Sequence, residues 1–333
     1  MNHHETNRAY AAAALASCLL ATGCGAQVQP ESEAGPPPVT VNNCGKDVTY
    51  PLPERPVAYD MSATEKMFAL GLADQLRGIV LPSTAEAPAS RSPFRKDYES
   101  VDVLGTDVLS REVVVEAKAD WVLAGWNSGF SQERGITPAL LEQVGIQSYL
   151  FTESCFNYGA EPVRVPPLEA LYTDLRQIGT IFRVPDRAAK VVADLQRRAQ
   201  ALRSDRPEGD PANVFVYDSG TDQPFTSGTQ AAPSAIIDLA GGEHVPRDLH
   251  ERWTNVGWES VVAAQPDVIT VVDYGDQPVR DKIEFLKSFP PLARTPAVRE
   301  NRFHVLDYGE AVSGPRNLDA AEDLAAYLRS VGR

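Results

Sequence analysis

The chain has 333 residues, which is longer than one average domain and is consistent with two domains. Its formal net charge of −14 at pH 7 argues against nucleic acid as a partner, because nucleic-acid binding requires a basic face. The same acidity argues against direct binding to an anionic bilayer.

The first 23 residues are typical of a secretory signal peptide. A weakly positive start precedes residues 9–20, an apolar stretch of about a dozen residues that is too short to span a bilayer. Residues 21–24, Ala-Thr-Gly-Cys, resemble a lipobox, the site at which bacterial lipoproteins are cleaved and the new N-terminal cysteine is diacylated. We therefore expect lipidation at Cys24. Lipidation at Cys18, or an ordinary secretory peptide with an incidental cysteine, stays open.

A tether is predicted next, over residues 24–38. This segment contains few apolar side chains and ends in three prolines, so it cannot fold alone. A lipid anchor followed by a disordered tether would place a folded protein at the outer face of the bacterial cytoplasmic membrane.

Two cysteines follow the tether, Cys44 and Cys155. In an exported protein two cysteines most simply form one disulfide, and this one would close a loop of 111 residues. The chain-entropy model assigns such a cross-link about 4–5 kcal/mol at most. Metal binding by the pair is disfavoured, because neither cysteine lies in a Cys-x-x-Cys or Cys/His cluster.

Short apolar segments alternate with helical patterns from residue 39 to 183, which predicts an N-terminal α/β lobe. It begins with a hairpin over 39–50 that turns at 43–45. Further strands are predicted at 56–60, 76–81, 121–124 and 148–151, and helices at 63–72 and 137–144. Because strands and helices alternate, we expect a mainly parallel sheet with helices on both faces.

Two helices are predicted between the halves of the chain. The first covers 168–182, and the second starts at Asp186, taken as its N-cap, and runs to about residue 204. Its apolar side chains keep one face over about four turns, and its length of about 27 Å is enough to reach from one lobe to the other. We therefore assign 184–205 as a linking helix and expect the lobes to rock by small angles.

The pattern of the first half restarts over residues 206–333, which predicts a C-terminal α/β lobe. Its strands are predicted at 214–217, 268–272 and 302–306, and its helices at 234–240 and 318–331. The predicted fold class is therefore α/β, with two Rossmann-like lobes of mainly parallel sheets joined by one long interdomain helix.

One short pattern occurs twice, 147 residues apart. Glu112 opens a short amphipathic helix, and Asp120, eight residues later, leads into an apolar strand. Glu259 and Asp267 repeat this arrangement in the second half. The distance is too long for a solenoid repeat and indicates two similar domains in one chain.

Together these features resemble the class III substrate-binding proteins of ABC importers, which bind ferric siderophores and cobalamin. The resemblance is carried by the two Glu-to-Asp segments and by residues 55–74, 171–182 and 227–242, and it covers nearly all of the mature chain. One departure is Ala119 in the first repeat, where the second has Pro266. The resemblance implies a monomeric lipoprotein, without cofactor or catalytic residues, that captures an iron–siderophore between its lobes and delivers it to an ABC permease.

In that family the glutamate of each repeat lies on the outer face of its lobe and pairs with arginines of the permease. Carried over to this chain, Glu112 and Glu259 would be docking residues, one on each lobe. Two acidic points at a fixed separation define position and orientation, and they steer the encounter by complementary charge. From the residues alone, each glutamate simply lies in the first turn of a helix, where the helix dipole favours an acidic side chain.

The ligand site is expected in the cleft between the lobes, where loops leave the carboxyl ends of both sheets. The side chains just past the predicted strands are Tyr59, Asp60, Pro82, Trp126, Asn127, Glu153 and Phe156 in lobe one, and Asp218, Phe225, Trp253, Asp273, Tyr274, Tyr308 and Arg316 in lobe two. We assign as ligand-binding residues Tyr59, Trp126, Phe156, Phe225, Arg252, Trp253, Tyr274, Tyr308 and Arg316. Aromatic rings suit a bulky, partly apolar chelate, although each could equally pack at the cleft edge.

Two of these assignments are specific. A tryptophan shortly before the second repeat lines the pocket in the family, and Trp253 holds that place. Arg252, beside it, is expected to bind a carboxylate or hydroxamate oxygen of the ligand; the other cations considered are Arg91, Arg95 and Arg316. The net acidity favours a neutral or cationic complex, but the sequence does not choose among hydroxamate, catecholate, cobalamin and haem ligands.

The sequence contains no motif for binding a bare metal ion, for serine hydrolysis or for nucleotide binding. His244, His250 and His304 are the histidines of the mature chain and lie apart, so no cluster suits a bare transition metal. Residues 125–129 do not match a nucleophile elbow, and no phosphate- or dinucleotide-binding glycine motif is present. The alternative functions are a cobalamin- or haem-binding protein of the same class, a secreted α/β enzyme, and a lipoprotein that only contacts other envelope proteins.

Overall fold

The computed structural model describes residues 35–159 and 163–333, and residues 36–333 form one compact unit. The predicted signal peptide over 1–23, the lipidation sites considered at Cys18 and Cys24, and most of the predicted tether lie outside the described residues. Among the described helices, none combines the length and the apolar character that a membrane span requires.

The described chain begins with a β-hairpin of β1 (Val39–Asn43) and β2 (Lys46–Tyr50), which pair antiparallel. Cys44 and Gly45 form the turn with φ angles of 51° and 80°, the left-handed conformation that a tight hairpin turn requires. Cys44 forms a disulfide with Cys155, as predicted, and the two Cα atoms are 5.2 Å apart. The bond fastens the hairpin to a helical segment 111 residues later.

Lobe one is built on a sheet of strand order β5-β4-β3-β6, in which both β8 and the short β7 pair with β6. All of these pairings are parallel. The strands are β3 (Pro56–Tyr59), β4 (Gly78–Val80), β5 (Val103–Gly105), β6 (Trp121–Trp126), β7 (Gly129–Phe130) and β8 (Gln147–Leu150). The helices are α1 (Asp60–Ala69), α2 (Glu86–Arg91), α3 (Arg95–Ser100), α4 (Arg111–Glu116) and α5 (Pro138–Glu142), with the short 3-10 helices η1 (Ala73–Gln75), η2 (Ser83–Ala85) and η3 (Thr152–Asn157).

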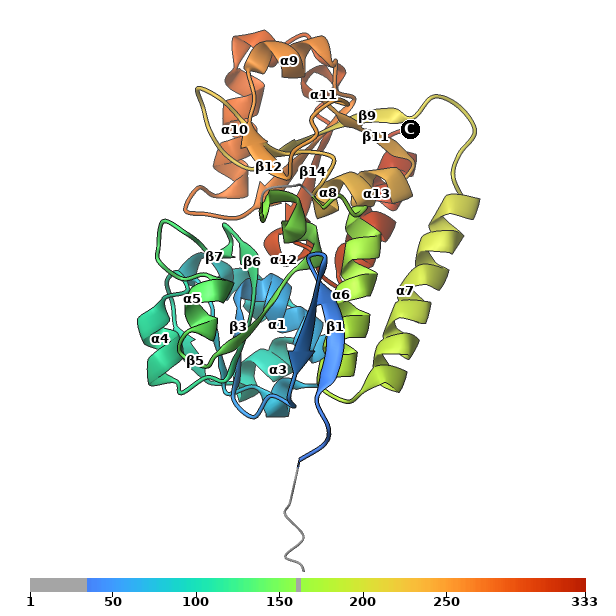
Figure 1. Cartoon of the computed structure of the whole chain (residues 1–333). Coiled ribbons are helices and arrows are strands. Elements are labelled where there is room, and N and C mark those ends of the chain that lie inside the picture. Colours follow the sequence, from blue (N-terminus) through green and yellow to red (C-terminus); the bar gives the residue numbers. More distant parts are fainter. Residues whose placement is uncertain (1–34, 160–162) are drawn as a thin grey trace, which may run out of the picture. The chain divides into compact units, whose positions relative to one another are not determined.

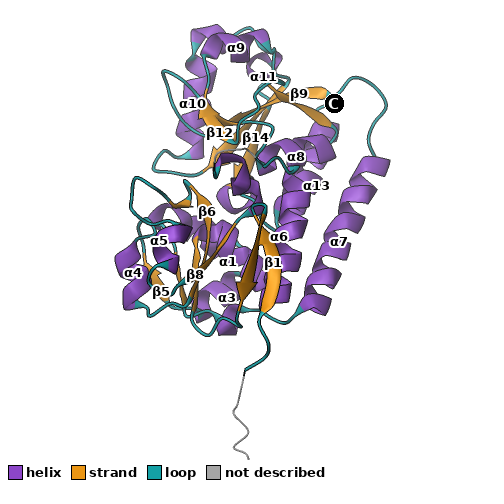
Figure 2. Ribbon diagram, in the orientation of Figure 1, coloured by secondary structure: helices purple, strands orange, loops and turns teal. Residues whose placement is uncertain are grey.

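Lobe two has a second parallel sheet, of order β11-β9-β13-β14. Its strands are β9 (Ala212–Tyr217), β11 (Gly242–Val245), β13 (Val268–Asp273) and β14 (Phe303–Asp307), and β10 (Phe225–Ser227) and β12 (Trp253–Asn255) form a separate antiparallel pair. Its helices are α8 (Ala232–Leu239), α9 (Trp258–Ala263), α10 (Val279–Ser288), η4 (Pro290–Leu292), α11 (Pro296–Arg299), α12 (Tyr308–Ala311) and α13 (Asn317–Ser330). In each lobe the chain adds strands to one side of its first strand and then to the other, the doubly wound pattern. Helices surround the strands of both lobes (Figure 2).

Two long helices, α6 (Pro167–Ile181) and α7 (Pro185–Ser204), pack side by side between the halves of the chain (Figure 1). The predicted linking helix is α7, which also contacts α8 and α13 of lobe two. Its start differs from the prediction: Val184 is the N-cap, Pro185 is the first helical residue, and no side chain caps the helix. Asp186 therefore lies within the first turn, where its negative charge interacts favourably with the helix dipole. The predicted fold class, two parallel α/β lobes joined by one long helix, is confirmed.

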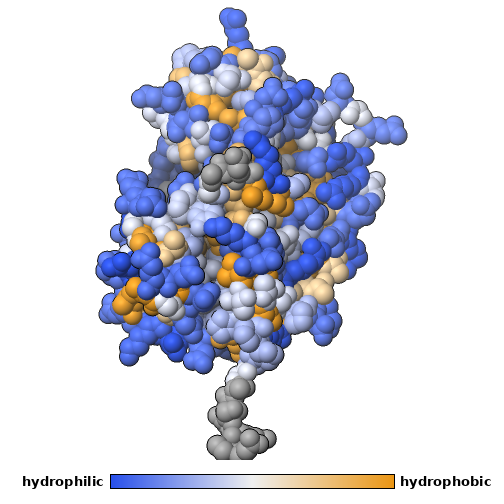
Figure 3. All heavy atoms as spheres, viewed as in Figure 1, coloured by the Kyte–Doolittle hydropathy of each residue, from blue (hydrophilic) through white to orange (hydrophobic). Residues whose placement is uncertain are grey.

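Three hydrophobic clusters hold this unit together. The largest contains buried side chains of both lobes, among them Met61 of lobe one and Val214 and Leu318 of lobe two. The other two lie within single lobes, one around Phe130 and one around Trp258. On the face viewed in Figure 3, hydrophilic side chains dominate and hydrophobic ones are scattered in small areas. Because one cluster crosses from lobe to lobe, the two lobes share part of their core.

Candidate functional site

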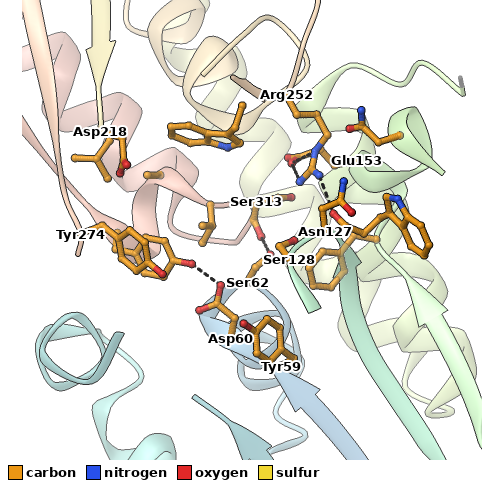
Figure 4. A pocket seen from close by; sticks show the side chains of 18 of the residues that line it. Tyr59, Asp60, Ser62, Asn127, Ser128, Glu153, Asp218, Arg252, Tyr274 and Ser313 are labelled. Carbon is orange, nitrogen blue, oxygen red and sulfur yellow. Dashed lines mark hydrogen bonds and ion pairs between the residues drawn. The ribbon is translucent and has the colours of Figure 1, made fainter. Parts of the chain in front are cut away.

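A pocket with a volume of about 490 Å³ lies between the lobes. Its walls come largely from the carboxyl ends of β3 and β6 in lobe one and of β9, β13 and β14 in lobe two, the edge at which parallel sheets bind ligands. The lining residues are Tyr59, Asp60, Ser62, Val108, Trp126, Asn127, Ser128, Arg134, Phe151, Glu153, Asn157, Asp218, Phe225, Glu251, Arg252, Trp253, Val272, Tyr274, Tyr308, Ala311, Val312 and Ser313. Figure 4 shows these side chains converging from both lobes.

Aromatic rings form much of the apolar wall. Seven of the nine residues predicted to bind the ligand line the pocket: Tyr59, Trp126, Phe225, Arg252, Trp253, Tyr274 and Tyr308. Tyr274 and Tyr308 stack with ring centroids 3.9 Å apart, and Phe225 and Trp253 stack at 5.8 Å. Because neighbouring rings hold one another in place, a ligand meets flat apolar surfaces that are already ordered.

Arg252 lines the pocket but is already paired within the protein. Its Nε and Nη2 donate to one carboxylate oxygen of Glu153 at 3.0 and 2.7 Å, and its Nη1 donates to the carbonyl of Trp126 at 3.4 Å. The side chains of Arg252 and Glu153 are 14% and 4% exposed and come from different lobes (Figure 4). Three N–H groups of the guanidinium therefore donate to protein acceptors, and its predicted contact with a ligand oxygen stays a prediction.

Two residues predicted to bind the ligand do not line the pocket. Arg316 is buried and forms ion pairs with three carboxylates, those of Glu65 (3.6 Å), Asp307 (3.2 Å) and Glu310 (3.2 Å). Arg316 was predicted to reach the cleft because it follows β14. The three carboxylates instead hold its side chain in the protein interior, outside the pocket lining. Phe156 lies in η3, and its ring faces the guanidinium of Arg164 at 5.0 Å.

The other cations considered from the sequence are also paired with carboxylates. Arg91 of α2 lies 2.7 Å from Asp273 and 3.0 Å from Asp307, so it bridges the lobes. Arg95 lies 3.4 Å from Glu99 on the same helix. Neither arginine lines the pocket.

Each lobe contributes one buried aspartate to the pocket, at the carboxyl end of its first strand. Asp60 is 6% exposed and Asp218 is 9% exposed, and burial raises the pKa of both carboxyl groups. Tyr308 donates a hydrogen bond to Asp60 at 2.5 Å, and Ser219 donates one to Asp218 at 2.8 Å. Within the described residues, neither carboxylate lies within the 4.0 Å of an arginine, lysine or histidine nitrogen that defines an ion pair.

Two polar residues of the lining, Ser62 and Ser313, were not predicted from the sequence. Ser62 donates to the carbonyl of Ser313 across the two lobes at 2.7 Å. The fully buried ammonium of Lys66 donates to the same carbonyl at 2.8 Å and to Ser62 at 3.1 Å. Burial lowers the pKa of Lys66, and Asp174, 3.6 Å away, acts in the opposite direction. Because Ser62 and Ser313 are 251 residues apart, only the packing of the lobes brings them together.

Neither a metal-binding cluster nor a serine–histidine pair lies in the pocket lining, among the residues that the structure describes. Among residues 35–159 and 163–333, no group of three or more His, Cys, Asp or Glu side chains is placed to hold a metal ion. A buried serine–histidine pair does occur, with Ser227 Oγ and His244 Nε2 3.2 Å apart, but neither residue lines the pocket. The Nδ1 of His244 has no hydrogen-bond partner in the described part of the chain, so no described residue orients the ring as a general base.

Glu112 and Glu259 occupy matching places on the two lobes. Each is exposed and lies in the first turn of a short helix, α4 or α9. The aspartates of the repeat have a structural role: Asp120 accepts hydrogen bonds from two backbone amides just before β3, and Asp267 accepts one from an amide of β9. The repeated aspartates therefore tie neighbouring strands together, whereas the repeated glutamates face solvent.

Residues 57–308 match the sequence model of the periplasmic binding protein family. A vitamin B12-binding protein of Pectobacterium carotovorum subsp. carotovorum (strain PC1) is 28% identical over 284 residues, covering 85% of this chain and 91% of that protein. An uncharacterized ABC transporter substrate-binding lipoprotein of Bacillus subtilis (strain 168) is 24% identical and covers 96% of both chains. The solved structure of an ABC-type Fe3+-hydroxamate transport system from Saccharomonospora viridis DSM 43017 has a TM-score of 0.73 at 23% identity, over 87% of this chain and 99% of that one. At that identity the similarity shows a shared fold alone.

Proposed function

This chain belongs to the periplasmic binding protein family, and from that premise we propose that it is the solute-binding lipoprotein of an ABC importer. In this proposal it captures an iron–siderophore in the pocket between its lobes and delivers it to the permease. Members of the family are extracytoplasmic binding proteins of transporters and not enzymes. The alternative of a secreted enzyme is therefore dropped.

One observation carries the proposal, a pocket whose apolar wall consists of aromatic rings from both lobes. Tyr59 and Trp126 come from lobe one, and Phe225, Trp253 and Tyr274 come from lobe two. Rings of this kind suit a bulky, partly apolar guest such as a metal chelate. A guest that touches both lobes also stabilises the arrangement in which it is held, because it binds that arrangement better than a more open one.

Cobalamin is the second candidate ligand. The observation that favours it is the vitamin B12-binding relative, which aligns with 85% of this chain. A corrinoid is also a bulky metal complex with apolar faces, so the aromatic wall supports it for the same physical reason. Haem is the remaining chelate to compare in the test.

Titration of intrinsic fluorescence tests the proposal, because Trp126 and Trp253 line the pocket. The ligands are a ferric hydroxamate, a ferric catecholate, cyanocobalamin and haem. We expect at least one to quench the fluorescence saturably, and we expect Trp253→Ala to weaken that binding about 10-fold or more, since a desolvated aromatic anchor contributes about 1–3 kcal/mol. Trp258→Phe is the matched control, because Trp258 packs in the core of lobe two outside the lining. No saturable quenching by any of the four would contradict the proposal.

We also propose that Glu112 and Glu259 dock the protein on the permease, since both are exposed at equivalent places on the two lobes. Replacing both by alanine should leave chelate binding intact and abolish uptake by cells. The control is the double variant Glu99→Ala/Glu284→Ala, which removes one exposed carboxylate from each lobe elsewhere. Normal uptake with the Glu112/Glu259 variant would refute the docking roles.

The lipid anchor is proposed at Cys24. The Bacillus relative, which is named a lipoprotein and aligns with 96% of this chain, supports it. In a bacterial host, Cys24→Ser should abolish incorporation of labelled palmitate and release the protein from the membrane fraction. If Cys24→Ser still incorporated palmitate and Cys18→Ser did not, Cys18 would be the lipidated residue.

A further inference from the structure

The charges of the pocket indicate the class of chelate that it holds, an inference that rests on the function proposed above. The ionisable side chains of the lining, tyrosines aside, are the carboxylates of Asp60, Glu153, Asp218 and Glu251 and the guanidiniums of Arg134 and Arg252. Arg252 is neutralised by Glu153, and Arg134 is exposed and donates to the carbonyl of Gly129 at 3.1 Å. Among the described residues, the lining therefore holds more carboxyl groups than guanidinium groups, and its less exposed cation, Arg252, is already paired with Glu153.

The two buried aspartates occupy equivalent positions in the two lobes. Each directly follows a tyrosine that ends the first strand of its lobe, Tyr59 in β3 and Tyr217 in β9. Asp60 and Asp218 consequently enter the pocket from opposite lobes (Figure 4). Asp60 also has a φ of 65°, a left-handed conformation that residues with a Cβ avoid and that is found preferentially at functional sites.

The lining also contains buried polar atoms without a partner. Glu153 binds Arg252 through one oxygen, and its other oxygen, Oε2, is buried and accepts no hydrogen bond from any residue that the structure describes. The Oγ of Ser313 is likewise buried without a partner. A buried acceptor without a donor is costly, so a ligand that supplies N–H, O–H or ammonium groups to these atoms gains affinity.

We propose that the pocket selects metal chelates without net negative charge, whose ammonium or N–H groups bind Asp60 and Asp218. A cationic or neutral trishydroxamate complex has this chemistry. A tris-catecholate complex with three negative charges lacks it, because its charges would face two buried carboxylates without a cation between them.

A matched pair of ligands tests this on the unmodified protein. Ferrioxamine B carries one free ammonium group, and its N-acetyl derivative has the same chelating groups and no charge. At pH 7.5 and constant ionic strength we expect ferrioxamine B to bind at least as tightly as the derivative, and both to bind about 100-fold or more tightly than the trianionic ferric enterobactin. Binding of the neutral cyanocobalamin instead of the hydroxamates would also support the charge selection and would identify the second candidate ligand.

Two variants assign the selection to the aspartates. Asp218→Asn and Asp60→Asn each replace a carboxyl group by an amide at nearly constant shape. In the latter the amide oxygen can accept from the Met61 backbone amide while the amide NH2 donates to the Tyr308 hydroxyl. We expect each to weaken ferrioxamine B about 10-fold and its acetylated form less than about threefold. Glu208→Gln, which removes an exposed charge from the loop between α7 and β9, is the control for net charge and should change neither.

The outcomes separate this inference from the proposed function. Ferric enterobactin binding as tightly as the hydroxamates, or more tightly, would overturn the charge selection and leave the importer function standing. Unchanged ferrioxamine B affinity in both aspartate variants would do the same. Absence of binding by every chelate, cyanocobalamin and haem included, would overturn the proposed function itself.

Discussion

Two of the polar contacts between the lobes use charged side chains in different surroundings. In the inner contact, Glu65 and Lys66 of lobe one meet Arg316 and the carbonyl of Ser313 from lobe two, and all four residues are buried. In the outer contact, Arg91 of lobe one reaches two carboxylates of lobe two, and its side chain is 49% exposed.

Burial decides what each contact can do. An exposed ion pair contributes about 0–1 kcal/mol, because water and salt screen it and because long side chains lose freedom on pairing. Breaking a buried pair costs about 3–5 kcal/mol, because the remaining charge is left in a dry core. The inner contact therefore fixes how the lobes meet. The outer contact can open and close at little cost, as a protein that admits a guest between its lobes requires.

The largest effect is expected from removing the counterion of Lys66. Asp174 lies 3.6 Å from the Lys66 ammonium, and both side chains are fully buried, so Asp174→Ala leaves an unpaired charge in the core. We expect the free energy of unfolding to fall by about 3–5 kcal/mol, measured by urea denaturation. The double variant Lys66→Met/Asp174→Asn should recover most of this loss, since no charge is then buried and the amide oxygen still accepts the hydrogen bond from the Thr152 amide. A loss below about 1 kcal/mol would make the Lys66–Asp174 pair no stronger than an exposed one.

A second effect, of intermediate size, depends on pH. Burial raises the pKa of Glu65 from 4.5 to about 7, while Arg316 and a 2.6 Å hydrogen bond from Ser92 act in the opposite direction. Asp307 also faces this carboxyl group and raises its pKa with a smaller effect, and the Tyr98 hydroxyl lies 3.5 Å from Oε1. The folded protein therefore holds a proton that the unfolded chain has released between pH 4.5 and 7, so the stability from this group is complete below pH 4.5 and is lost as the pH rises through 7.

The measurement is the free energy of unfolding of the natural protein relative to Glu65→Gln, which cannot titrate. That difference should fall by about 3 kcal/mol between pH 4.5 and pH 8, since one unit of pKa corresponds to about 1.4 kcal/mol. A difference that stays constant over this range would show that Glu65 is ionised throughout and that burial does not dominate the inner contact.

The smallest effect is expected at the outer contact. Arg91→Ala should change the free energy of unfolding by less than about 1 kcal/mol, and the change should disappear in about 0.5 M salt, because salt screens exposed charges. The loss in Asp174→Ala should persist at the same salt concentration. If Arg91→Ala lowered the free energy of unfolding by more than about 2 kcal/mol and salt did not reduce this loss, the outer contact would behave like a buried ion pair.

Long periodic elements of this fold were predictable from the sequence, and short ones were not. The linking helix predicted to begin at Asp186 spans Pro185–Ser204, because an apolar face repeated over several turns is a strong signal. The strands β10 and β12 have three residues each, too few to show alternation, and were not predicted. The helix α10 was also missed, although Val279, Ile283 and Leu286 repeat at helical spacing along it.

The candidate site was predictable where it follows from strand ends. Trp126, Tyr274 and Tyr308 lie at the carboxyl ends of β6, β13 and β14, and parallel sheets bring such residues to one edge. The partner of each charged side chain was not predictable. Arg252 binds Glu153, 99 residues earlier in the chain, because of how two separately folded sheets pack against each other, and no local pattern carries that information.

The hydrophobic cluster that takes side chains from both halves makes each half depend on the other for folding. Although the halves look like two copies of one domain, neither can complete its interior alone. Denaturation should therefore follow a single cooperative transition, with no stage at which one half survives. A fragment that stops at residue 205 would expose apolar surface and aggregate, so after export the chain has to emerge completely before it can become stable.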